Sequence, residues 1–201
     1  MKLFKNNTSP FARVAHGMLI EAGAQVEIDL VNQWESPARL VDRNPAQRIP
    51  TLELDDGTIL TEALIIASYA ADIAPEGSHL KTMTPWDYEI TGLAFGVFDA
   101  AVYTLNGRKI VSGEFGDPAF DGTEMGLRRR RSMVNGLKRL EGMTGKLSTS
   151  TVGLAEISVV TAQGYLALRF PGADWVPATP KIDEFVSDVK DRKSIETTIP
   201  G

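Results

Sequence analysis

Residues 1–76 alternate between strand-like and helix-like patterns, and this order restricts the folds that are open to the chain. The apolar run KLF near the start predicts a first strand. Residues 10–22 then carry apolar side chains at helical spacing, and Gly23 can end that helix. A second strand follows, with its apolar face formed by Val26, Ile28 and Leu30. If the two strands are parallel, the helix between them must form a right-handed crossover and lie across the sheet.

A β-hairpin is the next predicted element. Residues 31–47 are polar and are expected to form a loop with at most a short helix. Residues 51–54 and 58–60 are short apolar runs joined by Asp55-Asp56-Gly57, and an Asp-Gly pair between apolar runs is typical of a hairpin. The pattern predicts that two more strands join the sheet.

A helix is expected after the hairpin, capped by Thr61 and ended by Pro75 and Gly77. Its apolar residues are Leu64, Ile65, Tyr69 and Ile73. The predicted order over residues 1–76 is therefore strand, helix, strand, loop, strand, strand, helix.

From residue 84 onward the pattern is helical only. Thr84-Pro85-Trp86-Asp87 combines an N-cap, a proline at the first helical position and an acid at the third, and it opens a helix to about Leu105. Residues 106–122 are rich in Gly, Asp and Pro, and further helices are predicted over residues 123–141, over residues 154–170 and from Pro180. We therefore predict two domains, an α/β domain over residues 1–76 and an all-helical domain over residues 84–201.

The helix over residues 123–141 contains four consecutive arginines, Arg128 to Arg131. Such a run could bind phosphate, but on a helix the four side chains point in different directions. The expectation is a solvated face with salt bridges.

Composition excludes several kinds of chemistry. The chain has no cysteine, which removes disulfides, thiolate zinc sites and any protein thiol nucleophile. Its two histidines, His16 and His79, lie on different predicted elements, so a metal site is not expected and each is interpreted as a surface or core-edge residue. A net charge of −5 argues against nucleic acid as a partner. No apolar run is long enough for a membrane span and no signal peptide is recognisable, so the expected location is the cytoplasm.

Ser9, in the stretch TSPFA, precedes the first predicted helix. Ser is a favoured N-cap and Pro10 suits the first helical position, so a purely structural role is sufficient to explain the pair. The alternative is that the hydroxyl is held at a helix N-terminus to meet an anion. Local sequence alone favours the structural cap.

The whole chain resembles the cytosolic glutathione transferase family, and in particular its serine-type bacterial members. The stretch NPAQRIPTLELDDGTILTEALIIASYA is similar to the family pattern of Asn-Pro, a basic residue, Val or Ile, a cis proline, a hairpin and Glu-Ser opening a helix. SPFARV resembles the N-terminal motif of serine-type members, and LAEISVVTAQGYLALR resembles the Leu-Ala-Asp helix of the family. The resemblance implies a thioredoxin-like N-terminal domain, an all-α C-terminal domain, glutathione as co-substrate and a homodimer. Redox proteins of thioredoxin-like fold carry Cys-Pro-Phe-Cys where this chain has Ser9-Pro10-Phe11-Ala12, which excludes thiol–disulfide exchange by the protein.

The resemblance makes Ser9 the candidate stabiliser of the glutathione thiolate, with Thr8 as the alternative one residue earlier. It implies that the backbone of Ile49 pairs with the tripeptide like an added strand and that Pro50, in a cis bond, exposes that backbone. Arg48 would contact a carboxylate of glutathione, and Glu62 would meet its ammonium group. Taken singly, these residues also fit a solvated arginine, a core isoleucine and an acid in the first turn of a helix.

The chain departs from the family pattern at Ala63, where serine is usual, so a hydroxyl partner of the γ-glutamyl carboxylate is lost while the backbone N–H remains. Gly153, before Glu156, replaces the usual Ser or Thr cap and bears on stability. Ala63 favours a binding or regulatory protein without catalysis, whereas Ser9 and Glu62 favour an enzyme.

The expected activity is that of a glutathione transferase, which ionises glutathione and directs it at a small apolar electrophile. The alternatives are a non-catalytic glutathione transferase-like protein or a glutathione-dependent isomerase. The second substrate is expected between the domains, against the helix that begins near Trp86. That helix offers Phe95, Phe98 and Tyr103, which fit either the core or the pocket.

Overall fold

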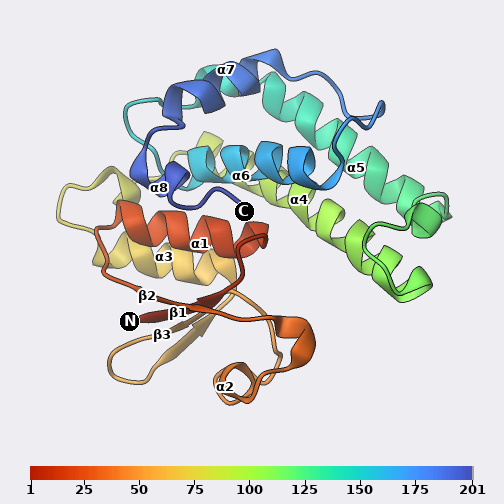
Figure 1. The fold of residues 1–201 in the computed structure, drawn as a ribbon. Coiled ribbons are helices and arrows are strands. Elements are labelled where there is room, and N and C mark those ends of the chain that lie inside the picture. The colour runs from red at the N-terminus through yellow and green to blue at the C-terminus, as the bar shows by residue number, and fades with distance from the viewer. Residues whose placement is uncertain (201) are drawn as a thin grey trace.

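The computed structural model describes residues 1–200, and its first part is built on a four-stranded sheet of order β2-β1-β3-β4. Strand β1 (Lys2–Lys5) pairs in parallel with β2 (Glu27–Leu30) and antiparallel with β3 (Thr51–Glu53), which pairs antiparallel with β4 (Ile59–Thr61). Helices α1 (Pro10–Glu21) and α3 (Ala63–Ile73) lie side by side over one face of the sheet (Figure 1). The predicted strand–helix–strand unit and hairpin are confirmed, with strand ends within one residue of the prediction.

Three local predictions in this part are wrong. Leu30 does not share a buried face with Val26 and Ile28: it is 54% exposed, because it ends β2, the edge strand of the sheet. Thr61 does not cap α3, because it is the last residue of β4 and Glu62 alone separates the two elements. The loop over residues 31–47 contains a 3₁₀ turn as well as one short helix, which are η1 (Gln33–Glu35) and α2 (Ala38–Val41).

Helix α3 buries one isoleucine and several alanines and leaves other large apolar residues exposed. Ile66, Ala67 and Ala70 face the core and are at most 1% exposed. Leu64 and Ile65, by contrast, are 46% and 55% exposed. Three of the four apolar residues that predicted this helix, Leu64, Ile65 and Ile73, are exposed in the single chain, and Tyr69 is partly buried.

The second part is helical, as predicted. Its helices are α4 (Pro85–Ser112), α5 (Glu124–Glu141), α6 (Leu154–Arg169), α7 (Pro180–Val189) and α8 (Lys193–Glu196), with 3₁₀ turns η2 (His79–Lys81), η3 (Pro118–Phe120) and η4 (Thr144–Lys146). Figure 1 shows α6 lying between α1 and the outer helices α5 and α7. Helix α8 was not predicted from the sequence. Within residues 1–200, no helix combines the length and the apolarity needed to cross a membrane.

Helix α4 begins as predicted but ends seven residues later than the predicted Leu105, at Ser112. At its start, the backbone N–H of Thr84 donates to Asp87 Oδ2 at 2.6 Å. Its last two turns are held by tertiary contacts, since Arg108 Nε donates to Asp121 Oδ1 at 2.8 Å and Gly107 packs directly against the ring of Phe120. These contacts with η3 and with Asp121 keep the chain helical up to Ser112, although residues 106–122 are rich in Gly, Asp and Pro, which favour a loop.

A polar cluster ties the C-terminal segment to α1. Arg192 Nε donates to Glu21 Oε1 at 2.7 Å, and the Ser194 hydroxyl contacts the same carboxylate. Burial opposes the charged form of Glu21, but the hydrogen bonds from Arg192 and Ser194 outweigh it and lower the pKa of this carboxyl below its usual value.

At the start of α6, Glu156 Oε2 accepts from the N–H of Gly153 at 3.0 Å, so the glycine cap is supported by the acid.

The arginine run of α5 does not form the predicted salt bridges, because none of the four residues has a carboxylate within 4.0 Å among residues 1–200. Arg128 and Arg131 are exposed, whereas the Cζ atom of Arg129 lies 4.1 Å from the centre of the Tyr103 ring and that of Arg130 lies 5.3 Å from Trp175. Two of the four side chains are therefore stacked on aromatic rings.

The histidines occupy separate sites. His16 is buried beside Lys5, and burial, followed by the charge of Lys5, lowers the pKa of its imidazole to about 4. His79 Nε2 lies 2.9 Å from the carbonyl oxygen of Val152. No group of residues suited to a metal ion occurs among residues 1–200.

Candidate functional site

Most of the candidate residues meet in one cleft of about 700 Å³, which we call the interdomain cleft. One wall comes from the turn before α1 and from the residues around β3 and α3. The other wall comes from α4 and α6. Six of the seven predicted site residues line it: Thr8, Ser9, Arg48, Ile49, Pro50 and Glu62.

Ser9 is held at the N-terminus of α1 by hydrogen bonds on both sides. Its Oγ accepts from the backbone N–H of Ala12 at 3.2 Å, which confirms the cap. Asn6 Oδ1 accepts from the N–H groups of Ser9 and Thr8, at 2.7 Å and 3.1 Å. Because Ser9 Oγ acts as an acceptor toward the helix, its own O–H hydrogen is left to donate into the cleft. The cap and the anion-binding interpretations of Ser9 are therefore compatible.

Asn6 is a part of this turn that the sequence analysis missed. Asparagine often accepts from backbone N–H groups two residues further on, so its position two residues before Thr8 was a usable signal. Its amide nitrogen donates to Gln33 Oε1 at 3.0 Å, which links the turn to η1.

The loop before β3 carries the next group of candidates. The Ile49–Pro50 peptide bond is cis, as the resemblance implied. Asn44 Nδ2 and Thr51 Oγ1 both donate to the carbonyl oxygen of Arg48, at 3.0 Å and 2.8 Å, and fix the loop from within. These contacts hold the backbone of Ile49 at the edge of the cleft.

Arg48 and Glu62, on the same wall of the cleft, form an ion pair with 2.8 Å between Arg48 Nη1 and Glu62 Oε1. Their side chains are 64% and 53% exposed, so the pair is open to solvent. An exposed pair of this kind contributes about 0–1 kcal/mol to stability. Both charges are thus available to a ligand at little cost to the fold.

Glu62 has a backbone φ of 71°, in the left-handed region that residues other than glycine seldom adopt. This residue turns the chain from β4 directly into α3. Ala63 is the first residue of α3, so its N–H has no acceptor within the helix. Its side chain is 2% exposed and does not line the cleft.

The helical wall of the cleft contains polar residues that the sequence analysis did not select. Tyr165 and Arg169 line it from α6 and Asp99 from α4. Tyr165 and Arg169 are four residues apart on a predicted helix and therefore lie on the same face, and this spacing could have marked them as a pair in the sequence. Burial raises the pKa of the Tyr165 hydroxyl, and the neighbouring Arg169 opposes this only in part.

The aromatic candidates of α4 divide between core and cleft. Phe98 is fully buried and Phe95 partly so, and both rings pack against Phe11 with centroids 5.2 Å and 6.1 Å apart. Tyr103 is 42% exposed and lines the cleft. The cleft therefore lies against α4, the helix expected to bear the second substrate, at its C-terminal half from Asp99 to Asn106.

An aromatic pair joins the two walls at the rim of the cleft. The rings of Trp34, in η1, and Phe115, after α4, are 5.6 Å apart, and both residues line the cleft. They extend the apolar surface that Tyr103 and Val102 provide.

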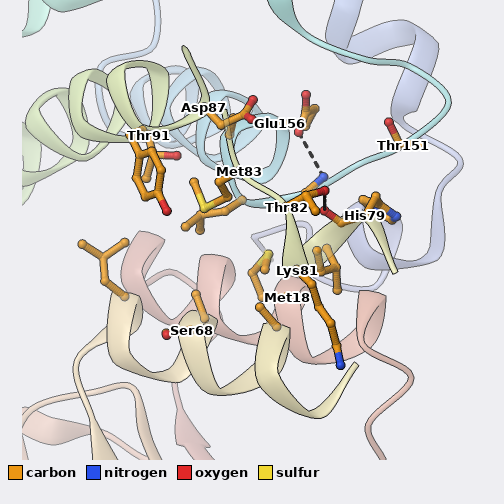
Figure 2. A pocket seen from close by; sticks show the side chains of 18 of the residues that line it. Met18, Ser68, His79, Lys81, Thr82, Met83, Asp87, Thr91, Thr151 and Glu156 are labelled. Atoms are coloured by element: carbon orange, nitrogen blue, oxygen red, sulfur yellow. Dashed lines mark hydrogen bonds between the residues drawn. The ribbon is translucent and has the colours of Figure 1, made fainter. Parts of the chain in front are cut away.

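A second pocket of about 800 Å³, the α3–α4 groove, opens between α3 and the N-terminal half of α4. Figure 2 shows Met18 and Met83 pointing into it, between Ser68 on α3 and Thr91 on α4. None of the predicted site residues lines this groove. It is bordered by Leu64 and Tyr88, which are 46% and 64% exposed.

Comparisons with known proteins agree with this architecture. Residues 8–73 match the family model for the N-terminal domain of glutathione S-transferases. An uncharacterized GST-like protein of Escherichia coli (strain K12), YibF, is 30% identical over 212 residues, which cover 100% of this chain and 98% of the relative.

Two crystal structures of transferases with bound glutathione are similar over nearly their whole length. A glutathione S-transferase from Methylobacillus flagellatus KT is 27% identical with a TM-score of 0.82, covering 100% of this chain and 99% of that one. A glutathione transferase family member from Pseudomonas fluorescens Pf-5 is 25% identical with a TM-score of 0.80, covering 100% and 98%. The fold is thus a thioredoxin-like N-terminal domain followed by an all-α C-terminal domain.

Proposed function

Because this chain belongs to the glutathione transferase family, we propose that it is an enzyme that ionises the thiol of glutathione and directs it at an electrophilic substrate. The observation that carries the proposal is the Ser9 hydroxyl at the N-terminus of α1, facing a cleft that also contains the Arg48–Glu62 pair. Two relatives with bound glutathione support the choice of this co-substrate.

The proposed role of Ser9 is to stabilise the thiolate of bound glutathione, and not to act as a nucleophile itself. A free thiol has a pKa of about 8.5, so only a few per cent is thiolate at neutral pH. Lowering this pKa by about two units requires about 2.7 kcal/mol of preferential stabilisation of the anion. A hydroxyl donating to a charged group supplies about 1.5–3 kcal/mol, and the helix N-terminus adds about 0.3–1 kcal/mol. The two contributions together are sufficient. Thr8, one residue earlier, is the alternative donor.

The remaining candidates are proposed to bind the tripeptide. The backbone of Ile49, beside Pro50, would pair with it like an added strand. Glu62 would receive the γ-glutamyl ammonium, and Arg48 would be released from Glu62 to meet a carboxylate of the ligand. The free N–H of Ala63 would donate to the γ-glutamyl carboxylate.

The electrophile is proposed to bind on the apolar part of the helical wall, near Tyr103 and Val102. We propose two domains, over residues 1–76 and 84–201, each of which contributes one wall of the cleft. We also propose that the protein is cytoplasmic and has a role in detoxification. A binding protein without catalysis is the second candidate, and Ala63 is the observation that favours it. Glutathione-dependent isomerisation would use the same sulfur site.

We also infer that the protein is a homodimer whose two copies meet at the α3–α4 groove. Leu64 and Ile65 on α3 and Trp86 and Tyr88 on α4 are each at least 46% exposed. Such apolar side chains next to a groove are typical of a protein–protein contact. A two-fold axis would place the same surface of each copy against the other.

The test of the proposed function compares turnover of glutathione with 1-chloro-2,4-dinitrobenzene in three variants. Ser9→Ala should lower kcat/KM by about tenfold to a hundredfold, which corresponds to about 1.4–2.7 kcal/mol. Thr123→Ala is the control, because it removes a similar N-cap far along the chain from the cleft residues of the N-terminal domain. In that cap, Thr123 Oγ1 accepts from the N–H of Gly126 at 3.0 Å. Unchanged activity in Ser9→Ala would contradict the assignment, and a loss in Thr8→Ala instead would transfer the role to Thr8.

A further inference from the structure

Arg169, the last residue of α6, brings an unpaired positive charge to the helical wall of the interdomain cleft. Within residues 1–200, no carboxylate lies within 4.0 Å of its guanidinium. Its Nε is buried and has no hydrogen-bond partner. That nitrogen is closed to a ligand, and the side chain also hydrogen-bonds Tyr165. The Nη groups of the guanidinium are therefore the donors that a ligand in the cleft can use.

The side chain of Arg169 is held in place by its neighbour on α6. Its Cζ atom lies 5.5 Å from the centre of the Tyr165 ring, and Tyr165 is 4% exposed. A cation over a buried aromatic ring is restricted in its movement as well as attracted to the ring. A guanidinium fixed in this way can donate two parallel hydrogen bonds to one carboxylate.

The other charges of the helical wall favour an anion at this end. Arg129 also has a buried Nε without a partner, and its Cζ atom lies 4.1 Å from the centre of the ring of Tyr103, which lines the cleft. Arg108 is neutralised by Asp121. The helical wall has one carboxylate, Asp99, which is exposed to solvent and lies more than 4.0 Å from the Arg169 guanidinium. An anionic group would therefore be directed toward Arg169 and away from Asp99.

From these observations, and resting on the proposed function, we propose that the second substrate carries a carboxylate and that Arg169 binds it. The body of that substrate is aromatic or apolar, because Tyr103, Trp34 and Phe115 form the adjoining surface. Arg169 is thus a specificity-determining residue, separate from Arg48, which serves glutathione itself.

Calorimetry with two glutathione conjugates tests this assignment without requiring turnover. S-(4-carboxybenzyl)glutathione and S-benzylglutathione differ only in the carboxylate. The parent protein should bind the carboxylated conjugate about tenfold more tightly, which corresponds to about 1.4 kcal/mol. Arg169→Gln should abolish this preference and leave the affinity for S-benzylglutathione unchanged. Arg128→Gln, which removes an exposed arginine of α5 outside the cleft, should retain the full preference.

Two further variants protect the test against a simple folding defect. Arg169→Lys keeps the charge but not the paired donors, so it should retain part of the preference. Asp99→Asn removes the opposing charge and should increase the preference.

Equal binding of the two conjugates by the parent would overturn the inference. So would an equal loss of both in Arg169→Gln, since the arginine would then serve the glutathione part. In both cases glutathione still binds and the proposed function stands. If glutathione and both conjugates fail to bind, the proposed function is wrong and the inference fails with it.

Discussion

Replacing Glu62 by Gln should weaken glutathione binding by about fivefold to thirtyfold. In the free protein, the Glu62 carboxylate is 53% exposed and lies 2.8 Å from Arg48, so its pairing there contributes about 0–1 kcal/mol. In the complex it would face the ammonium of glutathione, and a hydrogen bond between charged groups contributes about 1.5–3 kcal/mol. The difference leaves about 1–2 kcal/mol that depends on the charge of Glu62.

Glu89→Gln is the matched control for this measurement. Glu89 also forms a partly exposed ion pair, with 2.8 Å to Arg139, but it does not line the interdomain cleft. Titration calorimetry should therefore give the parent affinity for glutathione in Glu89→Gln and a reduced affinity in Glu62→Gln. Equal affinities in the two variants would refute the reasoning.

Ala63→Ser completes the comparison. Ala63 is 2% exposed and its side chain does not line the cleft, so an added hydroxyl must turn toward the ligand beside the backbone N–H at the start of α3. The substitution should tighten glutathione binding by about 0.5–1.5 kcal/mol, which is less than the ~1.5–3 kcal/mol of a hydrogen bond to a charged group because the hydroxyl must be moved from a buried position. If the parent gives no heat and neither Glu62→Gln nor Ala63→Ser changes this, the non-catalytic interpretation becomes the better one.

Three further predictions concern assembly and stability. Leu64→Glu should convert the dimer into a monomer in light scattering. Ile110→Glu, at a position on α4 that is 84% exposed, should leave the dimer intact. A parent protein that is already monomeric at micromolar concentration contradicts the dimer. Gly107→Ala should lower the free energy of unfolding by about 1–3 kcal/mol, because a Cβ there would lie 2.6 Å from the ring of Phe120 in η3. In Gly96→Ala, on the same helix, the Cβ meets no atom within 4 Å, so the change should be neutral or stabilising. Equal effects of the two substitutions in denaturant unfolding would refute this. Glu21→Gln should destabilise the protein by about 1–3 kcal/mol at neutral pH. Since the folded-state pKa of Glu21 is lowered, this contribution is complete above its unfolded pKa and lost as the pH falls through the folded value. A parent–variant difference that does not shrink as the pH is lowered would be contrary evidence.

The sequence was most informative where local chemistry decides the structure. Ser9 and Pro10 specify the start of α1 by themselves, and the Asp-Gly turn specifies the hairpin, so both were predicted within a residue. Six cleft residues of the N-terminal domain were selected because they lie in two short, recognisable segments of the chain, whereas Asn6 and Trp34, outside the quoted motifs, were not.

The helical wall of the cleft could not be predicted in the same way. Tyr165 and Arg169 face the cleft because of the way α6 packs against α1 and α4, and a helical pattern alone does not state which partner each face will meet. The end of α4 was misplaced for the same reason, since Asp121 and Phe120 hold its last turns. The exposed Leu64 on α3 shows the converse, because an apolar residue in a helical pattern need not face the core of its own chain.

The pKa of the thiol of bound glutathione is the most direct measure of the central claim. It can be followed by the ultraviolet absorbance of the thiolate as the pH of the saturated complex is varied. We expect a value about two units below the ~8.5 of a free thiol in the parent and in Thr123→Ala, and a return of about one to two units toward that value in Ser9→Ala. A bound thiol that titrates like free glutathione in the parent, or an unchanged pKa in both Ser9→Ala and Thr8→Ala, would contradict the account.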